Sequence, residues 1–255
     1  MTKKKVRDED FILSEKEILE RAKEKVNSVL NTEFKVIAKN ESQKELIRSI
    51  KNNEITICTG KAGTGKTFVS LAFALGLLKA RNNNFNKLYL VKSVTTLKGE
   101  EIGYLKGTLQ EKIEPFMWSF LINMEKLIDD SIINQLLEND LVRPFPLAYA
   151  RGTTLDNAII VADEMQNVSL DNARTLLTRI GKDSKMVLLG DSNQIDLKNK
   201  DESSLDPLLA MFSGVEKIGC IKMNDKDVNV RNPLINIIED KFKFYYERNY
   251  NGKKQ

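Results

Sequence analysis

Residues 59–68, TGKAGTGKTF, combine three glycines with two lysines and threonine hydroxyls, directly after the apolar run ITIC. Glycines let the backbone adopt left-handed turns and come close to an anion, so that its N–H groups can surround a phosphate. The stretch fits the phosphate-loop pattern G-x-x-x-x-G-K-[ST] at each fixed position. It therefore predicts a nucleotide phosphate site, whose binding residues we expect to be Gly60, Lys61, Ala62, Gly63, Thr64, Gly65, Lys66, Thr67 and Phe68.

Two side chains of this stretch carry the chemistry of the site. Lys66 can reach the β and γ phosphates, and the Thr67 hydroxyl can hold Mg²⁺. The helix predicted to follow would point its positive end at the same anion. A flexible strand-to-helix loop that binds nothing is the alternative, and the full match between a strand and a helix argues against it.

The second motif is acidic and lies in AIIVADEMQN, where four apolar residues lead to Asp163 and Glu164 at the carboxyl end of a predicted strand. Ligands bind at that edge in open α/β sheets. Asp163 would bind Mg²⁺ directly or through water, and Glu164 would orient and deprotonate the attacking water. A strand end or helix cap would explain either carboxylate alone but not the pair, so the motifs together predict hydrolysis.

The third element is KMVLLGDSNQIDL, which ends another apolar strand at Gly190-Asp191 and has Gln194 three residues further on. An amide beside the γ phosphate could sense whether that phosphate is intact. A surface turn formed by Gly-Asp-Ser-Asn is the competing interpretation.

Composition sets the class of protein that can carry these motifs. Of the 255 residues, 30% are charged and 41% hydrophobic, with a formal net charge of +4, which permits a nucleic-acid-binding patch without requiring one. No apolar run approaches the ~20 residues that span a bilayer, and the start of the chain lacks a signal-peptide pattern. The absence of histidine excludes histidine acid–base catalysis. With Cys58 and Cys220 interpreted as reduced core residues, we expect a cytoplasmic protein with no membrane partner.

Alternating strands and helices predict an α/β fold with a doubly wound, mostly parallel sheet and helical additions. Strands are predicted at 54–60, 87–93, 158–164, 185–191 and, more weakly, 216–223; helices are predicted at 14–30, 40–51, 68–80 and 170–180. We divide the chain into a helical extension (1–35), one domain (36–247) with a helical insertion at about 94–147, and a basic tail (248–255). Residues 241–255 alternate aromatic and basic side chains, which favours a packed amphipathic helix with a frayed end over a nucleic-acid-binding strip.

Four blocks occur in order: TGKAGTGKT, YARGTTLDNAIIVADEMQN, LLTRIGKDSKMVLLGDSNQIDL and DKDVNVRNPLINII. With them, the chain resembles the PhoH-like family of ATPases, which are related to the core of superfamily 1 helicases. The resemblance covers about residues 36–247. It implies a RecA-like fold, ATP as substrate, action on RNA or single-stranded nucleic acid, and ring-like oligomers.

The resemblance also implies roles for single residues. Gln43 matches a glutamine that reads adenine in related helicases, although with Asn40 it also completes a helix capping box. Arg231 matches the family's late arginine and is the preferred arginine finger. Arg179 matches another arginine that could reach a γ phosphate, or it is a cation in the last turn of a helix.

The chain departs from the family pattern mainly where nucleic acid would bind. VKSVTTLKGEEIGYLKG replaces an arginine-proline motif, Asn232 stands where a histidine is common, and LKNKDESSLDPLL lacks a glycine before its leucine. No nuclease-like domain precedes residue 36, so we expect no ribonuclease activity. Candidate phosphate contacts (Lys92, Lys98 and Lys106) and a stacking Tyr104 are equally consistent with a solvated charged face.

Superfamily 1 helicases bind ATP between two RecA-like domains, whereas this chain has room for one. We therefore expect a neighbouring copy to complete the site in a head-to-tail, six-membered ring. The predicted function is Mg²⁺-dependent ATP hydrolysis coupled to binding or movement on single-stranded RNA or DNA. The alternative is a nucleotide-gated assembly module without unwinding activity, and a small-molecule kinase is disfavoured by the water-activating Glu164.

Overall fold

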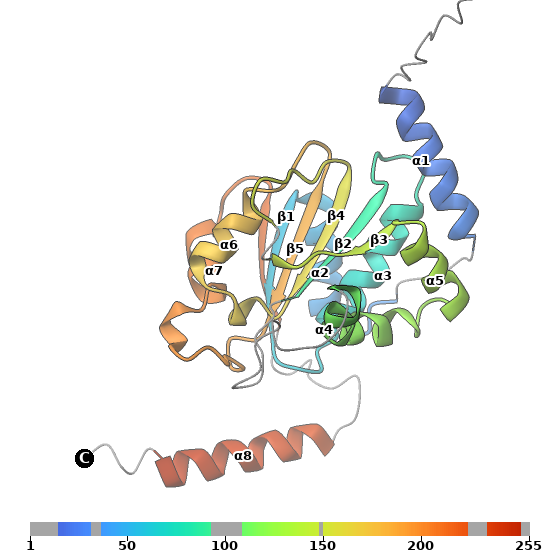
Figure 1. Ribbon diagram of the computed structural model, residues 1–255. Helices are drawn as coiled ribbons and strands as arrows, with labels where there is room; N and C mark the ends of the chain where they lie inside the picture. The colour runs from blue at the N-terminus through green and yellow to red at the C-terminus, as the bar shows by residue number, and fades with distance from the viewer. Residues whose placement is uncertain (1–14, 32–36, 93–108, 148–149, 224–233, 251–255) are drawn as a thin grey trace, which may run out of the picture.

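The protein is built around one sheet of six strands in the order β3-β2-β4-β5-β1-β6 (Figure 1). This computed structural model describes residues 15–31, 37–92, 109–147, 150–223 and 234–250. The strands are β1 (Ile55–Thr59), β2 (Lys87–Lys92), β3 (Val142–Pro144), β4 (Ala158–Asp163), β5 (Lys185–Gly190) and β6 (Ile218–Lys222). All five strand pairings are parallel, so every strand ends at the same edge of the sheet.

Helices cover both faces of the sheet. One face carries α1 (Glu15–Val29), α2 (Glu41–Asn52), α3 (Lys66–Lys79), α4 (Leu109–Met124) and α5 (Asp130–Glu138) over a core that includes Leu75, Leu88 and Phe120. The other carries the short helix η3 (Met165–Asn167), α6 (Leu170–Leu177), η4 (Lys200–Glu202) and α7 (Leu205–Phe212). Its core includes Ile160, Leu176 and Leu188. The predicted fold class, an α/β RecA-like domain with a doubly wound parallel sheet and helical additions, is confirmed.

The central strands are buried on both faces, which explains their continuous apolar sequence. All six residues of β4 are buried, whereas the edge strand β6 is only partly covered. Cys58 on β1 and Cys220 on β6 are both free thiols and face different cores. Burial raises the pKa of the Cys58 thiol to about 12, so it stays protonated as the expected core residue.

The predicted amino-terminal helix packs against the far end of α3. Val26 and Leu30 are fully buried in the same core as α3. The Lys23 ammonium donates to the carbonyls of Leu78 and Ala80, each at 2.9 Å, where α3 ends. A cation at that position satisfies carbonyls that have no partner within the helix. Helix α1 thereby braces the helix that starts at the phosphate loop.

Three elements differ from the sequence-based expectation. The predicted helical insertion contains α4 and α5 but also β3, which pairs with β2 at the edge of the sheet. Helix α6 ends at Leu177, three residues early, and the Thr178 hydroxyl donates back to the Arg174 carbonyl at 3.0 Å.

Helix α8 (Leu234–Tyr250) confirms the helix predicted near the carboxyl end, but the packing expected of it is wrong. It lies apart from the sheet (Figure 1), and Ile237, Phe242 and Phe244 are 55%, 56% and 62% exposed. Among the described residues, no helix has both the length and the apolar character needed to cross a bilayer.

Candidate nucleotide-binding site

A cavity of about 410 Å³ opens at the sheet edge where β1, β4 and β5 end. The phosphate loop and the first turns of α3 form its floor, and the residues that follow β4 and β5 form one wall. The opposite wall comes from the segment before α2, from α2 itself and from the end of α4. The lining residues are Ile37, Lys39, Gln43, Ala62, Gly63, Gly65, Lys66, Thr67, Phe68, Asn123, Lys126, Asp163, Glu164, Gly190, Asp191 and Gln194.

The glycines of the phosphate loop serve two different purposes. Gly63 and Gly65 have φ values of 83° and 84°, in the left-handed region that the sequence predicted for them. Gly60 is needed for packing, because a Cβ there would lie 2.8 Å from the Cβ of Met223. Six of the nine predicted binding residues line the cavity, and Gly60, Lys61 and Thr64 do not.

Lys66 lies at the start of α3 with only 8% of its surface exposed. Its ammonium donates to the carbonyls of Gly60 and Lys61, the latter at 2.9 Å. Burial lowers the pKa of Lys66, while the neighbouring carboxylates of Asp191 and Asp163 oppose that shift. The cation is held at the loop by carbonyl oxygens that incoming phosphate oxygens can replace.

The two predicted metal ligands meet in the cavity. The Thr67 hydroxyl donates to Asp163 Oδ2 at 2.7 Å, and both residues line the space beside the phosphate loop. Within the described ranges, no cluster of three or more carboxylate, thiol or imidazole groups is arranged to hold a metal. A hydroxyl and a carboxylate fit Mg²⁺, which takes few protein oxygens and completes its shell with phosphates and water.

Glu164 follows β4 in a left-handed conformation, with φ 58° and ψ 36°. This backbone conformation is uncommon outside glycine and persists only where the surroundings enforce it. The Glu164 N–H donates to Asp163 Oδ1 at 2.9 Å, and its Oε2 accepts from Gln166 Nε2 at 2.6 Å. The carboxylate that was predicted as the base therefore faces the cavity under restraint. Sequence reasoning missed Gln166 because nothing in DEMQN distinguishes it from a core polar residue.

The segment after β5 faces the phosphate loop and is more than a surface turn. The Ala62 N–H donates to Asp191 Oδ2 at 2.9 Å, across a sequence separation of 129 residues. Gln194 lines the cavity, and its role as a γ-phosphate sensor stays a prediction. Asp191 was not predicted as a site residue, and its carboxylate accepts a hydrogen bond from an N–H group of the phosphate loop.

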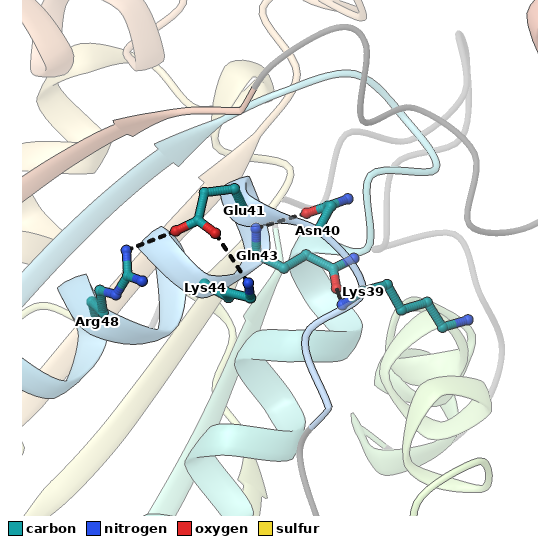
Figure 2. A network of polar contacts seen from close by, with 6 residues as sticks. All are labelled: Lys39, Asn40, Glu41, Gln43, Lys44 and Arg48. Atoms are coloured by element: carbon teal, nitrogen blue, oxygen red, sulfur yellow. Dashed lines mark hydrogen bonds and ion pairs between the residues drawn. The ribbon is translucent and has the colours of Figure 1, made fainter.

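Gln43 is part of the cap of α2 (Figure 2), and it also lines the cavity. Its N–H donates to Asn40 Oδ1 at 2.9 Å, which confirms Asn40 as the N-cap of α2. Its side-chain oxygen accepts from the Lys39 N–H at 2.8 Å, and its Nε2 donates to the Thr64 carbonyl at 2.9 Å. Gln43 thereby ties the α2 cap to the phosphate loop and also lines the cavity. Its adenine-reading role stays a prediction.

Arg179 lies at the opposite edge of the sheet from the cavity. Its Nη1 donates to the carbonyl of Thr153, which precedes β4, whereas Asp163 is the last residue of that strand. Six strand residues at about 3.3 Å each separate the two edges by roughly 20 Å. The structure therefore does not bring Arg179 to the site of its own chain.

The other predicted contacts divide between described and undescribed residues. Lys92 Nζ donates to the Ser119 hydroxyl on α4 at 2.9 Å, so it helps to hold that helix. Arg231, the preferred arginine finger, lies outside the described residues, as do Lys98, Lys106 and Tyr104. Asn123 and Lys126, at the end of α4, were missed because helical spacing does not reveal which loop a helix flanks.

Comparison with known proteins shows which protein family this chain is similar to. A family model described as "PhoH-like protein" matches residues 35–243. A PhoH-like protein of Synechocystis is 37% identical over 216 residues, which cover 85% of this chain and 63% of that protein. A PhoH-like protein of Bacillus subtilis is 35% identical over 193 residues, covering 76% and 59%. Protein PhoH of Escherichia coli is 29% identical over 194 residues, covering 75% and 54%. The chain thus spans about six tenths of the length of these relatives.

Among solved structures, the large terminase of a thermophilic bacteriophage gives a TM-score of 0.46 at 11% identity. That comparison covers 79% of this chain and 49% of the terminase. The HK97 bacteriophage large terminase also gives a TM-score of 0.46, at 13% identity over 78% of this chain and 43% of that one.

Proposed function

The chain belongs to the PhoH-like protein family, and we propose that this nucleoside triphosphatase of the phosphate-loop type hydrolyses ATP in a Mg²⁺-dependent reaction. One observation carries the proposal: Lys66, the Thr67–Asp163 pair and Glu164 line one cavity at the carboxyl edge of the sheet. A site that only bound nucleotide would have no use for a restrained carboxylate facing the phosphate loop.

The phosphates would be held mainly by the loop and by Lys66. The N–H groups around Gly63 and Gly65, together with the positive end of α3, offer donors to the β phosphate. Lys66 would exchange its bonds to the Gly60 and Lys61 carbonyls for phosphate oxygens. Thr67 and Asp163 would hold Mg²⁺, which neutralises charge on the triphosphate when it is bound.

The reaction requires a water aligned with the γ phosphate and a group to accept its proton. Glu164 would orient that water and take its proton, and Gln194 would contact the γ phosphate from the wall after β5. The restraint on Glu164 supports this role, since a base fixed before the substrate arrives needs no reorganisation during the reaction.

We propose that a second copy completes the site. The cationic side chains that line the cavity within the described residues are Lys39, Lys66 and Lys126, with no arginine among them. An arginine finger is worth about 10³ to 10⁵ in turnover, or roughly 4 to 7 kcal/mol of barrier. Arg231 or Arg179 of a neighbour would supply it in a head-to-tail ring of six, and the far-edge location of Arg179 supports contact with the next copy.

Coupling of the reaction to single-stranded RNA or DNA is the remaining part of the proposal. Its support is family membership together with the net charge of +4. A cytoplasmic location fits the two free thiols, Cys58 and Cys220.

Phosphate release from ATP, measured with Mg²⁺ and with chelator, tests the core of the proposal. We expect turnover with Mg²⁺, its loss with chelator, and a several-fold rise on adding single-stranded RNA or DNA that fades with salt. A polymer-independent rate would favour the assembly module instead. The absence of any Mg²⁺-dependent release, over a range of protein concentrations with and without polymer, would refute the proposal.

Subunit mixing tests the shared site. Lys66→Met removes a subunit's own site, and Arg231→Ala or Arg179→Ala removes the finger that it would lend. If the finger acts on a neighbour, a one-to-one mixture of a lysine variant and the correct arginine variant should regain about a quarter of wild-type activity, since one interface in four is intact. Activity no higher than the mean of the two variants would show that the site is complete within one chain.

A further inference from the structure

We infer that Gln166 is a positioning residue for the proposed hydrolysis: its buried amide joins the Glu164 carboxylate to the loop that follows β5. The inference rests on the proposed role of Glu164 as the base. It concerns a side chain that does not line the cavity and that no motif in the sequence identified.

All three bonds made by this amide lead to the two catalytic segments. Gln166 Nε2 donates to Glu164 Oε2 at 2.6 Å and to the Gln194 carbonyl at 3.1 Å. Gln166 Oε1 accepts from the Asp191 N–H at 3.0 Å. One planar group thus bridges the carboxylate after β4 and both ends of the segment 191–194.

The surroundings hold the amide in place. Gln166 has 0% of its surface exposed and sits in η3, directly behind Glu164. Gly190 makes room for it, because a Cβ at that position would lie 2.6 Å from Gln166 Oε1 and 2.7 Å from Leu205 Cδ2. Since the amide is buried and away from the cavity, it cannot contact nucleotide directly and must act through its partners.

The chemistry of these bonds predicts what Gln166 contributes. A hydrogen bond to an ionised carboxylate is stronger and more directional than one between neutral groups, so it fixes which oxygen of Glu164 remains available to water. The same amide reaches the loop that carries Gln194. Because the amide bonds to the backbone carbonyl of Gln194, a shift of the segment 191–194 toward a γ phosphate would move the amide and, with it, the base. Gln166 couples the detection of the phosphate to the alignment of the base.

Two substitutions separate this role from simple packing. Gln166→Met keeps an unbranched side chain of similar length but loses both the donor and the acceptor. Gln166→Glu keeps an acceptor for the Asp191 N–H and replaces the donor to Glu164 with a second carboxylate. Gln135→Met is the matched control, because Gln135 lies exposed on α5 away from the cavity.

The measurements are kcat and KM for ATP, the Kd of a non-hydrolysable ATP analogue, and the melting temperature, for wild type and all three variants. We expect kcat to fall about 100-fold in both Gln166 variants, the size of effect seen when one preorganised donor is lost. The analogue Kd should stay within about threefold of wild type, since binding groups are untouched. Gln135→Met should match wild type in every quantity.

The pH profile supplies a readout that packing alone would not change. Two carboxylates this close share a proton, and that proton restores a donor between residues 164 and 166. Relative to wild type at the same pH, Gln166→Glu should therefore recover roughly fivefold or more as the pH falls from 8 to 6.

Each outcome decides the inference. A kcat within threefold of wild type in folded Gln166→Met or Gln166→Glu overturns it and leaves the proposed function intact. Parallel losses of analogue affinity, melting temperature and kcat, without recovery of Gln166→Glu at low pH, also overturn it and assign Gln166 to packing. Wild-type protein without Mg²⁺-dependent hydrolysis removes the proposed function and this inference together.

Discussion

The two ends of the cavity are held together in different ways. At the strand end, formed by Thr67, Asp163, Glu164 and Gln194, Thr67 donates to Asp163, and Gln166 joins the Glu164 carboxylate to the backbone carbonyl of Gln194. At the helix end, formed by Lys39, Gln43, Asn123 and Lys126, the groups come from two segments at least 80 residues apart. There, the side-chain amide of Gln43 is hydrogen-bonded to the backbone of Lys39 and Thr64.

This contrast indicates a division of labour. Groups fixed by mutual hydrogen bonds before substrate arrives lower the barrier, because they need no rearrangement in the transition state. Groups assembled from separate elements shape the space that holds the rest of the nucleotide. Changes at the strand end should therefore reduce kcat, and changes at the helix end should weaken binding and leave kcat close to wild type.

The largest effect is expected where the phosphate loop meets the strand end. Lys66→Met removes the cation that would reach the β and γ phosphates, and kcat/KM should fall about 10²- to 10³-fold. Steady-state phosphate release measures it, with Lys51→Met as control because Lys51 is exposed on α2. If kcat/KM fell equally in Lys66→Met and Lys51→Met, Lys66 would have no larger effect than an exposed surface lysine.

Asp163→Asn should raise the Mg²⁺ concentration needed for half-maximal activity. The affinity for nucleotide without metal should stay unchanged. The substitution replaces a charged oxygen beside Thr67 with a neutral one, and because loss of a group that only supports a metal ligand costs about 10- to 100-fold in affinity, we expect a loss of at least that size. A Mg²⁺ titration of activity measures the shift, and Asp171→Asn, exposed on α6, is the control. An unchanged Mg²⁺ midpoint would exclude Asp163 as a ligand.

Gln43→Met should affect the helix end and the stability of the chain. It leaves the Lys39 N–H and the Thr64 carbonyl without their partner, which costs about 1 to 3 kcal/mol of unfolding free energy. Denaturant unfolding checks that loss, and we expect about tenfold weaker nucleotide binding with kcat within threefold of wild type. A collapse of kcat at unchanged Kd would contradict the proposed division between the two ends.

Lys126→Met should have the smallest effect of the four. Lys126 is exposed at the mouth of the cavity, where a single screened charge is worth about 0.2 to 1 kcal/mol, or less than about sixfold in Kd. Titration of an ATP analogue at low and high salt measures this, and the difference from wild type should vanish at high salt. If kcat fell by a larger factor than the affinity for the analogue, Lys126 would have to be counted among the residues that lower the barrier.

Much of the strand end could be predicted from the sequence because its residues lie in short contiguous motifs. The apolar runs that form β1, β4 and β5 deliver Thr67, Asp163 and Gln194 to one sheet edge, as parallel strands require. Strand β3 could not be predicted, because it is three residues long and ends in Pro144, so it carries no periodic signal.

The contacts that span the chain were beyond the reach of local patterns. Gln166 acquires its role from Gln194 and Asp191, which lie more than 20 residues further along the chain. Asn123 and Lys126 reach the cavity only because α4 packs beside α3, a tertiary fact that helical spacing does not reveal. The reason for Gly60, its closeness to Met223, was likewise hidden until β6 was placed beside β1.

The most direct test compares substrate binding with bond cleavage in wild type and Glu164→Gln. Single-turnover phosphate release and the Kd for Mg·ATP should be measured on the same preparations. We expect the two Kd values to agree within about threefold, while release slows by about 10²- to 10⁴-fold, the range for loss of a positioned base. Equal release rates in the two proteins would contradict the assignment of this cavity as an ATP-hydrolysing site with Glu164 as its base.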